Sequence, residues 1–213
     1  MKIEEILRLS PVIPILTIDS IEDAIPLATA LVRGGLRVIE ITLRTPIAFE
    51  AIREIATQLP SAILGIGTVT SPNDFIKGAD AGAKFAISPG FTEELNSAAI
   101  LPWLPGVATP KEIMIASQAG HNILKFFPAN QYGGVSTLRA FSEPFSNVMF
   151  CPTGGVTQET APNYLALSNV ISVCGSWLAP RSSIIAGNWE DIYQHARATS
   201  SFTKKKDSNT FPT

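Results

Sequence analysis

The sequence is poor in charged residues. Only 16% of its 213 residues are Asp, Glu, Lys or Arg, and the formal net charge is −2. An average soluble protein has about 25% charged residues. The 46% of residues that are apolar exclude an intrinsically disordered chain, and the lack of a basic half argues against nucleic acid as the main partner. The low charge therefore requires extensive burial, or a second subunit that covers part of the surface.

Cysteine and histidine are also scarce, with two of each. Cys151 and Cys174 cannot form a disulfide scaffold for a chain of this length, so we expect both to be buried apolar residues. His121 and His195 stand in no HExxH or HxH pattern, and we expect side chains at the surface or at strand edges. Proton transfer in this protein must then use groups other than histidine.

Long apolar runs are missing. No run reaches the roughly 18 residues that a membrane span requires. Residues 1–10 include two glutamates and lack the apolar centre of a signal peptide. We therefore expect a cytoplasmic protein without a membrane partner.

The chain does contain a regular alternation of short β-branched runs and helix-like segments. Eight strands are predicted, at 12–18, 38–43, 63–69, 85–88, 103–107, 123–127, 149–153 and 171–176. Amphipathic segments lie between them, among them 21–33, 47–58, 72–81 and 111–119. Ser71 and Pro72 mark a helix start. Gly34-Gly35, Gly82 and Gly120 fall just past predicted helix ends, where a left-handed residue is favoured.

Strict alternation of strand and helix predicts a parallel sheet with right-handed crossovers. Eight units of about 25 residues match a compact (β/α)8 TIM barrel in the α/β class. The alternative is a doubly wound open sheet, although no GxGxxG turn follows the first strand. We expect one domain over 1–202 and a solvated, frayed tail over 203–213.

The second predicted strand has a polar face. Because side chains alternate across a strand, Glu40, Thr42 and Arg44 share one face and the apolar residues between them share the other. The apolar face must meet the helices, so the polar face points into the barrel. Buried charges are costly unless they are paired or used. Glu40 and Arg44 therefore either form a stabilising ion pair or belong to a site.

A lysine interrupts the sixth predicted strand. Lys125 lies within an apolar run, and lysine is among the residues least often buried. One interpretation is a strand-edge lysine whose amine reaches solvent. The other is an amine nucleophile, since burial and a nearby cation such as Arg44 favour the neutral form that attacks a carbonyl. An amine beside the Glu40 carboxylate would suit Schiff-base chemistry.

Glycines follow the last two predicted strands. Thr153 precedes Gly154 and Gly155, and Gly175 precedes Ser176. In barrels of this class the loops after strands seven and eight often bind phosphate through backbone amides. This position predicts a phosphate site, although a pair of glycines is by itself more often a turn.

Six motifs together resemble one family. They are EITLRT at 40–45, GIGTV at 65–69, SPG at 88–90, KFFPA at 125–129, PTGG at 152–155 and GSW at 175–177. Their order and content, over about residues 10–180, are similar to the class I, metal-free aldolases of 2-keto-3-deoxy-6-phosphogluconate (KDPG) and 4-hydroxy-2-oxoglutarate (KHG). The resemblance implies a lyase that requires no cofactor and no metal, and it implies a homotrimer.

The resemblance also implies roles for individual residues. Lys125 matches the Schiff-base lysine, and Glu40 matches the general acid and base. Other matched positions are those that hold the substrate carboxylate (Arg44 and Thr68), line the pocket (Pro89 and Phe127) or receive the phosphate (Gly154, Gly155 and Ser176, with Gly175 next to them). Thr153 matches the gluconate-type enzymes, whereas galactonate-specific relatives tend to have an aliphatic residue there. The segment 130–134 departs from the family pattern, which puts the substrate range in question.

The sequence hypothesis is therefore a class I aldolase that cleaves KDPG to pyruvate and glyceraldehyde 3-phosphate, with KHG cleavage to pyruvate and glyoxylate as a second activity. Two alternatives remain at this point. A phosphate-binding barrel isomerase or epimerase would use the glycine loop without needing Lys125. A catalytically silent barrel would only bind a phosphorylated ligand.

Overall fold

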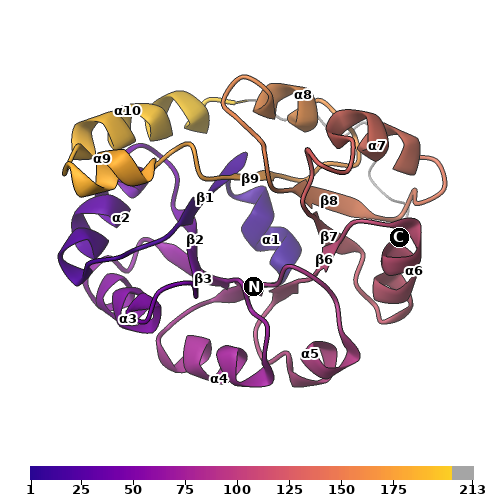
Figure 1. Cartoon of the computed structure of the whole chain (residues 1–213), viewed down its shortest axis with the longest axis horizontal. Coiled ribbons are helices and arrows are strands. Elements are labelled where there is room, and N and C mark those ends of the chain that lie inside the picture. Colours follow the sequence, from indigo (N-terminus) through magenta and orange to yellow (C-terminus); the bar gives the residue numbers. More distant parts are fainter. Residues whose placement is uncertain (203–213) are drawn as a thin grey trace.

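The structure is a computed structural model that describes residues 1–202, so the tail expected at 203–213 lies outside the described residues. Figure 1 shows strands arranged around a short central helix, α1, with the other helices outside them. Strands and helices follow each other in alternation along most of the chain. The predicted α/β class is confirmed.

The strands form two parallel sheets. The larger sheet has six strands in the order β5-β4-β3-β2-β1-β9, and the smaller has three in the order β6-β7-β8. All pairs of neighbouring strands are parallel. The strands are β1 (Val12–Leu16), β2 (Val38–Thr42), β3 (Ile63–Gly67), β4 (Phe85–Ile87), β5 (Trp103–Leu104), β6 (Gly106–Val107), β7 (Ile123–Phe126), β8 (Met149–Pro152) and β9 (Val173–Gly175).

All eight predicted strand segments contain a strand, and the fifth contains two. Pro105 separates β5, which pairs with β4, from β6, which pairs with β7. Proline has no backbone N–H to donate to a neighbouring strand. Its carbonyl still accepts a hydrogen bond from the Lys125 amide at 2.9 Å.

All helices except the central α1 lie on the outer faces of the sheets (Figure 1). The helices are α1 (Ile3–Arg8), α2 (Ala24–Arg33), α3 (Ala48–Gln58), α4 (Pro72–Asp80), α5 (Glu93–Ala98), α6 (Pro110–Gln118), α7 (Gly134–Phe141), α8 (Ala161–Leu165), α9 (Arg181–Ile185) and α10 (Trp189–Ser200), with a 3-10 turn, η1 (Ile21–Asp23), before α2. Within residues 1–202, no helix is both long enough and apolar enough to cross a membrane.

The predicted helix signals are largely confirmed. α4 begins at Pro72, and the Asp74 carboxylate accepts hydrogen bonds from the amides of Thr70 and Ser71, both at 2.9 Å. Gly35, Gly82 and Gly120 have left-handed backbones with φ of 96°, 100° and 93°. The expectation was wrong for Gly34, whose φ is −72°. A side chain there would collide with Ala196 of α10, so this glycine allows the close approach of two helices.

Two buried clusters lie on opposite faces of the strands. Ile39 and Ile41 of β2 belong to the large cluster between strands and helices. Val38 belongs to the smaller cluster on the inner face, with Cys151 and Cys174. The alternation expected for β2 is therefore observed. It places Glu40 and Thr42, both buried, on the same inner face as Val38.

The amino-terminal helix closes one end of this inner face. Ile6 and Leu7 of α1 are fully buried and belong to the inner cluster. They pack at the end of the sheet where the strands begin. The side chains that could form a site must therefore lie deeper in the interior or at the other end, where the strands finish.

Candidate active site

The structure brings Lys125 and Glu40 together. Lys125 lies in β7 and Glu40 in β2, and their side chains are 7% and 1% exposed. The Lys125 Nζ is 3.8 Å from the Glu40 Oε1. This distance is too long for a good hydrogen bond. The two groups are near enough for proton exchange through the hydroxyl of a substrate bound between them.

Burial shapes the chemistry of Glu40. Its Oε2 atom is buried and has no hydrogen-bond partner among residues 1–202. Burial raises the pKa of the Glu40 carboxyl above its ordinary value of 4.5, and the charges of Lys125 and Arg44 only partly oppose this. A carboxyl with a raised pKa and a free oxygen can both accept and return a proton.

Gly67 of β3 makes the room that Glu40 occupies. An added Cβ at Gly67 would lie 2.6 Å from the Glu40 Cγ, nearer than real atoms approach. The sequence showed Gly67 only as part of a motif. The structure gives it a physical role, because any larger residue would displace the carboxylate.

The Lys125 amine also faces an aromatic ring. Its Nζ lies 4.9 Å from the centre of the Phe127 ring, within the range of a cation–π contact. In the strand register, Lys125 pairs with Cys151 of β8. Cys151 and Cys174 are fully buried free thiols with sulfurs 3.3 Å apart, as expected of buried cysteines. The hydrogen bond with Cys174 raises the pKa of the Cys151 thiol, and burial raises it further. The Cys151 thiol is therefore kept protonated.

Arg44 lies at the rim rather than inside. It is exposed, and its Nη2 donates to the Thr17 Oγ1 at 2.9 Å. Thr17 lies 3.1 Å from Thr42 through their hydroxyl oxygens, and Thr42 donates to the Leu16 carbonyl at 2.9 Å. This chain of contacts orients the guanidinium above the ends of β1 and β2. The sequence did not identify Thr17. The only sign of it there is that it is polar and lies near the end of the first predicted strand.

Thr68 follows β3 in a strained conformation. Its φ of 64° makes it the one non-glycine residue with a positive φ within residues 1–202. A β-branched residue avoids this region unless the surroundings impose it, and such strain is often found at functional sites.

Pro89 is exposed in the loop after β4. Ser88 is buried before it, donates to the Gly90 carbonyl at 2.6 Å and accepts from the Trp103 Nε1 at 3.0 Å. These two contacts hold the short loop that carries Pro89.

The two glycines after β8 both have a left-handed backbone. Gly154 and Gly155 have φ of 97° and 74°, which strongly favours glycine. The Gly154 carbonyl accepts from the Asn130 amide at 3.0 Å, and the buried Thr153 accepts from the Ala129 amide at 2.7 Å. Within residues 1–202, neither the Gly154 nor the Gly155 amide donates to another backbone group. Both amides are therefore available to an anion.

Gly175, which ends β9, and Ser176, which follows it, differ in their surroundings. The space that glycine leaves at Gly175 is filled by the ring of Trp177, whose atoms would overlap an added Cβ. Ser176 is exposed and lines a cavity at the same end of the strands. Ser176 is therefore open to the cavity, whereas the ring of Trp177 covers Gly175.

That cavity has a volume of about 550 Å³, within the range of small-molecule sites. Its lining comes from the end of β1, from the segments that follow β1, β2 and β9, and from α9: Ile15, Thr17, Asp19, Arg44, Thr45, Ser176, Ala179, Arg181 and Ile184. Asp19 and Arg181 were not identified from the sequence. Within residues 1–202, no group of three or more His, Cys, Asp or Glu residues is arranged to hold a metal ion.

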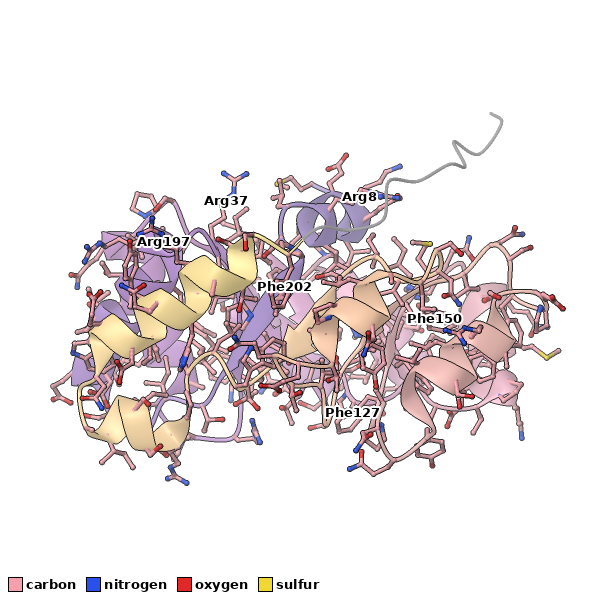
Figure 2. All side chains as sticks on the ribbon, turned by 90° about the horizontal axis from the view of Figure 1, so that it is seen from above. Arg8, Arg37, Phe127, Phe150, Arg197 and Phe202 are labelled. Carbon is pink, nitrogen blue, oxygen red and sulfur yellow. The ribbon has the colours of Figure 1, made fainter. Side chains whose placement is uncertain are left out.

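Figure 2 relates the site to the rest of the molecule. Phe127, next to the site, is on one side of the molecule, and Arg8 and Arg37 are on the opposite side. Arg37 directly precedes β2, whereas Arg44 follows its end. The candidate site therefore lies at the carboxyl ends of the strands, where barrel enzymes carry their active sites.

Comparisons with known proteins agree with this geometry. The family model for KDPG and KHG aldolases matches residues 3–195. The KHG/KDPG aldolase of Escherichia coli strain K12 is 47% identical over 197 residues, which cover 91% of this chain and 92% of that protein. The chain belongs to the KDPG and KHG aldolase family. The resemblance in the motifs is thus confirmed, over a longer stretch than residues 10–180.

Solved structures from this family have the same fold. The KDPG aldolase of Legionella pneumophila, with pyruvate captured as a covalent carbinolamine, has a TM-score of 0.92 and 44% identity, over 94% of this chain and 99% of that one. The KDPG aldolase of Zymomonas mobilis ZM4, with 3-phosphoglycerate, has a TM-score of 0.90 and 40% identity, over 94% and 96%. Both of these similar structures are therefore KDPG aldolases.

Proposed function

We propose that this protein is a class I aldolase, a lyase that cleaves KDPG to pyruvate and glyceraldehyde 3-phosphate. The observation that carries the proposal is the buried Lys125 amine, 3.8 Å from the buried Glu40 carboxylate. The names of the relatives support it, since two of them are a KHG/KDPG aldolase and the 2-dehydro-3-deoxy-phosphogluconate aldolase of Dickeya dadantii, each 47% identical to this chain.

In the first half of the reaction, the neutral Lys125 amine attacks the keto carbon of the substrate. Glu40 moves protons during formation of the carbinolamine and its loss of water to give a protonated imine. The Legionella relative, with pyruvate held as a carbinolamine, supports this sequence of events. The positive imine nitrogen then serves as the acceptor for the electron pair of the bond to be broken.

In the second half, Glu40 removes the proton from the hydroxyl on carbon 4. The bond between carbons 3 and 4 breaks, and its electrons form an enamine with the imine carbon. Glyceraldehyde 3-phosphate leaves. Glu40 returns the proton to carbon 3, and water hydrolyses the imine to release pyruvate and the free Lys125 amine.

The remaining predicted residues bind the substrate at its two ends. Arg44 and Thr68 would hold the carboxylate, and Pro89 and Phe127 would line the pocket around the reacting bond. Phosphate binding falls to the amides of Gly154 and Gly155 and to Ser176. Holding both ends fixes the reacting bond over Lys125, which accelerates a reaction by orientation.

We propose KDPG as the main substrate and KHG as a second one. Thr153, buried after β8, favours the gluconate form of the substrate by resemblance to gluconate-type enzymes. KHG is the second substrate that we propose, because the E. coli relative carries both names.

We also propose that the two sheets close into one eight-stranded (β/α)8 barrel that forms a single domain. Two isolated parallel bridges support closure, Phe150 with Val170 and Thr153 with Cys174. One joins β8 to the segment before β9, and the other joins the residue after β8 to β9. At the other junction only Pro105 separates β5 from β6.

A homotrimer in the cytoplasm completes the proposal. A designed cage made by fusing symmetric oligomeric domains has a chain with a TM-score of 0.76 and 27% identity to this one, over 89% of this chain and 70% of that one, which supports an oligomer. Two adjacent buried thiols without a disulfide fit a reducing compartment.

Borohydride trapping tests the proposal. Pyruvate and borohydride, added together, should attach a reduced pyruvyl group to Lys125, detected by peptide mass spectrometry. Lys125→Arg should prevent both labelling and pyruvate release from KDPG in an assay coupled to lactate dehydrogenase. Lys77→Arg, a matched change on α4, should alter neither result.

The same experiment separates the alternatives. An isomerase or epimerase would leave Lys125 unlabelled and release no pyruvate. A silent phosphate-binding barrel would be stabilised by a phosphorylated ligand without turning it over. An active enzyme with unlabelled Lys125 would overturn the Schiff-base mechanism.

A further inference from the structure

An ion pair crosses the rim of the site cavity. The Arg181 Nε, at the start of α9, lies 3.0 Å from the Asp19 Oδ2, just after β1. Both side chains reach solvent, with 70% and 42% of their surfaces exposed. They line the same cavity as Arg44 and Ser176.

An exposed ion pair contributes little stability by itself, typically less than about 1 kcal/mol. Asp19 is the one ion-pair partner of Arg181 among residues 1–202. A guanidinium carries five N–H donors in a planar fork, so a contact through Nε leaves most of them free. Arg181 lines a cavity whose other lining residues include Ser176.

The charges of the substrate and of the cavity suggest a use for these donors. A phosphate group carries about −1.5 to −2 charges at pH 7 and three acceptor oxygens. The phosphate site inferred from the sequence consists of glycine amides and a serine, without a cation. Arg44 is held by Thr17 at the ends of β1 and β2, and the proposed function assigns it to the substrate carboxylate. Arg181 supplies a second cation, on the chain segment that carries Ser176.

We propose that Arg181 binds the substrate phosphate, with Asp19 holding its guanidinium at the rim, and thereby sets the preference for a phosphorylated over an unphosphorylated keto acid. The inference rests on the proposed aldolase function. It adds a charged, bidentate contact to a site that otherwise consists of neutral donors.

The test compares two substrates that differ only in the phosphate, KDPG and 2-keto-3-deoxygluconate. Arg181→Ala should lower the ratio of their kcat/KM values by about tenfold, through a higher KM for KDPG with little change in kcat. Arg181→Lys should recover part of the ratio. Added salt should reduce the preference of the wild type more than that of Arg181→Ala, because an exposed charge is screened.

Arg37→Ala is the matched control. Arg37 is an exposed arginine at the other end of β2, on the opposite side of the molecule from Phe127 (Figure 2), and its loss changes the net charge equally. The ratio should remain at the wild-type value in this variant. A fall as large as that in Arg181→Ala would mean that net charge, not a local contact, sets the preference, and would overturn the proposal.

The double variant Asp19→Asn/Arg181→Ala tests the alternative that Arg181 acts only by neutralising the charge of Asp19. If Arg181 only neutralised Asp19, removing both charges would restore the ratio, which would overturn the proposal. If Arg181 contacts the phosphate, the ratio stays low. An unchanged ratio in Arg181→Ala, or an equal loss on both substrates, would also contradict the proposal while leaving the aldolase function intact. If the wild type cleaves neither substrate, the aldolase function and this inference both fail.

Discussion

At the residue scale, the site depends on a carboxyl group that is buried without a full set of hydrogen bonds. Glu40 is 1% exposed, its Oε2 has no partner in residues 1–202, and its Oε1 lies 3.8 Å from the Lys125 amine. A stabilising ion pair would have shorter, saturated hydrogen bonds. The incomplete pairing instead suits a group that must exchange protons with a bound substrate.

Glu40→Gln tests this interpretation. The amide keeps the shape of the side chain but cannot accept a proton, so turnover of KDPG should fall by about a hundredfold or more with the fold unchanged. Burial raises the pKa of Glu40 above 4.5, and only the carboxylate can act as a base. Wild-type activity should therefore fall as the pH is lowered through a value above 4.5, and this acid limb should be missing from the profile of Glu40→Gln.

Circular dichroism of the wild type and of Glu40→Gln measures whether the fold is kept, and their pH–rate profiles measure the acid limb. If Glu40→Gln unfolds the protein while specific activity of the folded fraction is kept, Glu40 and Lys125 are only a structural pair. An acid limb that persists unchanged in the variant would assign the titration to another group.

The residues of the site differ in how well the sequence predicts them. Lys125 and Glu40 interrupt apolar strands, so the period of two places them on the inner face. Asp19 and Arg181 are charged residues in loops that are far apart in the chain, and nothing local shows that they meet. Their proximity depends on the parallel pairing of β1 with β9, which only the folded structure provides.

At the element scale, neighbouring strands share the space around the carboxyl group. β2 pairs with β3 in a register that sets Glu40 opposite Gly65 and Thr42 opposite Gly67. The Glu40 side chain leans over Gly67, where an added Cβ would lie 2.6 Å from its Cγ. The glycine on one strand therefore decides where the carboxylate of the next strand can lie.

Gly67→Ala should displace that carboxylate and lower kcat by at least tenfold, because a small misplacement of a catalytic group is costly. The matched control is Gly90→Ala, since no atom lies within 4 Å of the added methyl group there. Its kcat should stay within about twofold of the wild type. Steady-state kinetics of both variants test this, and wild-type kcat in Gly67→Ala would contradict the proposed position of Glu40.

The sequence predicts the strands better than it predicts the break at Pro105 or the helix α1. Every predicted strand segment is occupied because β-branched runs between turn signals are strong local patterns. The break at Pro105 was missed, although a proline inside a predicted strand is a warning. α1 was not predicted, because six residues are too few to show a helical period. Its place in the fold comes from burial of Ile6 and Leu7 against distant strands.

At the scale of the whole molecule, the packing of α1 and the chemistry of the site lie at opposite ends of the strands. α1 covers the end of the inner cluster where the strands begin, and Arg8 at its last turn is on the opposite side from Phe127 (Figure 2). The charged and polar groups of the site gather where the strands finish. A change that removes packing at the α1 end should therefore reduce stability without altering the reaction.

Ile6→Ala makes that change. Ile6 is 1% exposed in the inner cluster, and its truncation should lower the free energy of unfolding by about 2–4 kcal/mol through lost burial and a residual cavity. Ile76→Ala, the same substitution at a side chain 53% exposed on α4, should change it by less than about 0.5 kcal/mol. Urea unfolding measures both. Below the unfolding transition, kcat and KM for KDPG should match the wild type in each variant, because Ile6 lies at the end of the strands away from the site and Ile76 is exposed on α4. A fall in kcat for Ile6→Ala alone would show that packing against α1 helps to position the catalytic pair, and that the two ends of the molecule are not independent.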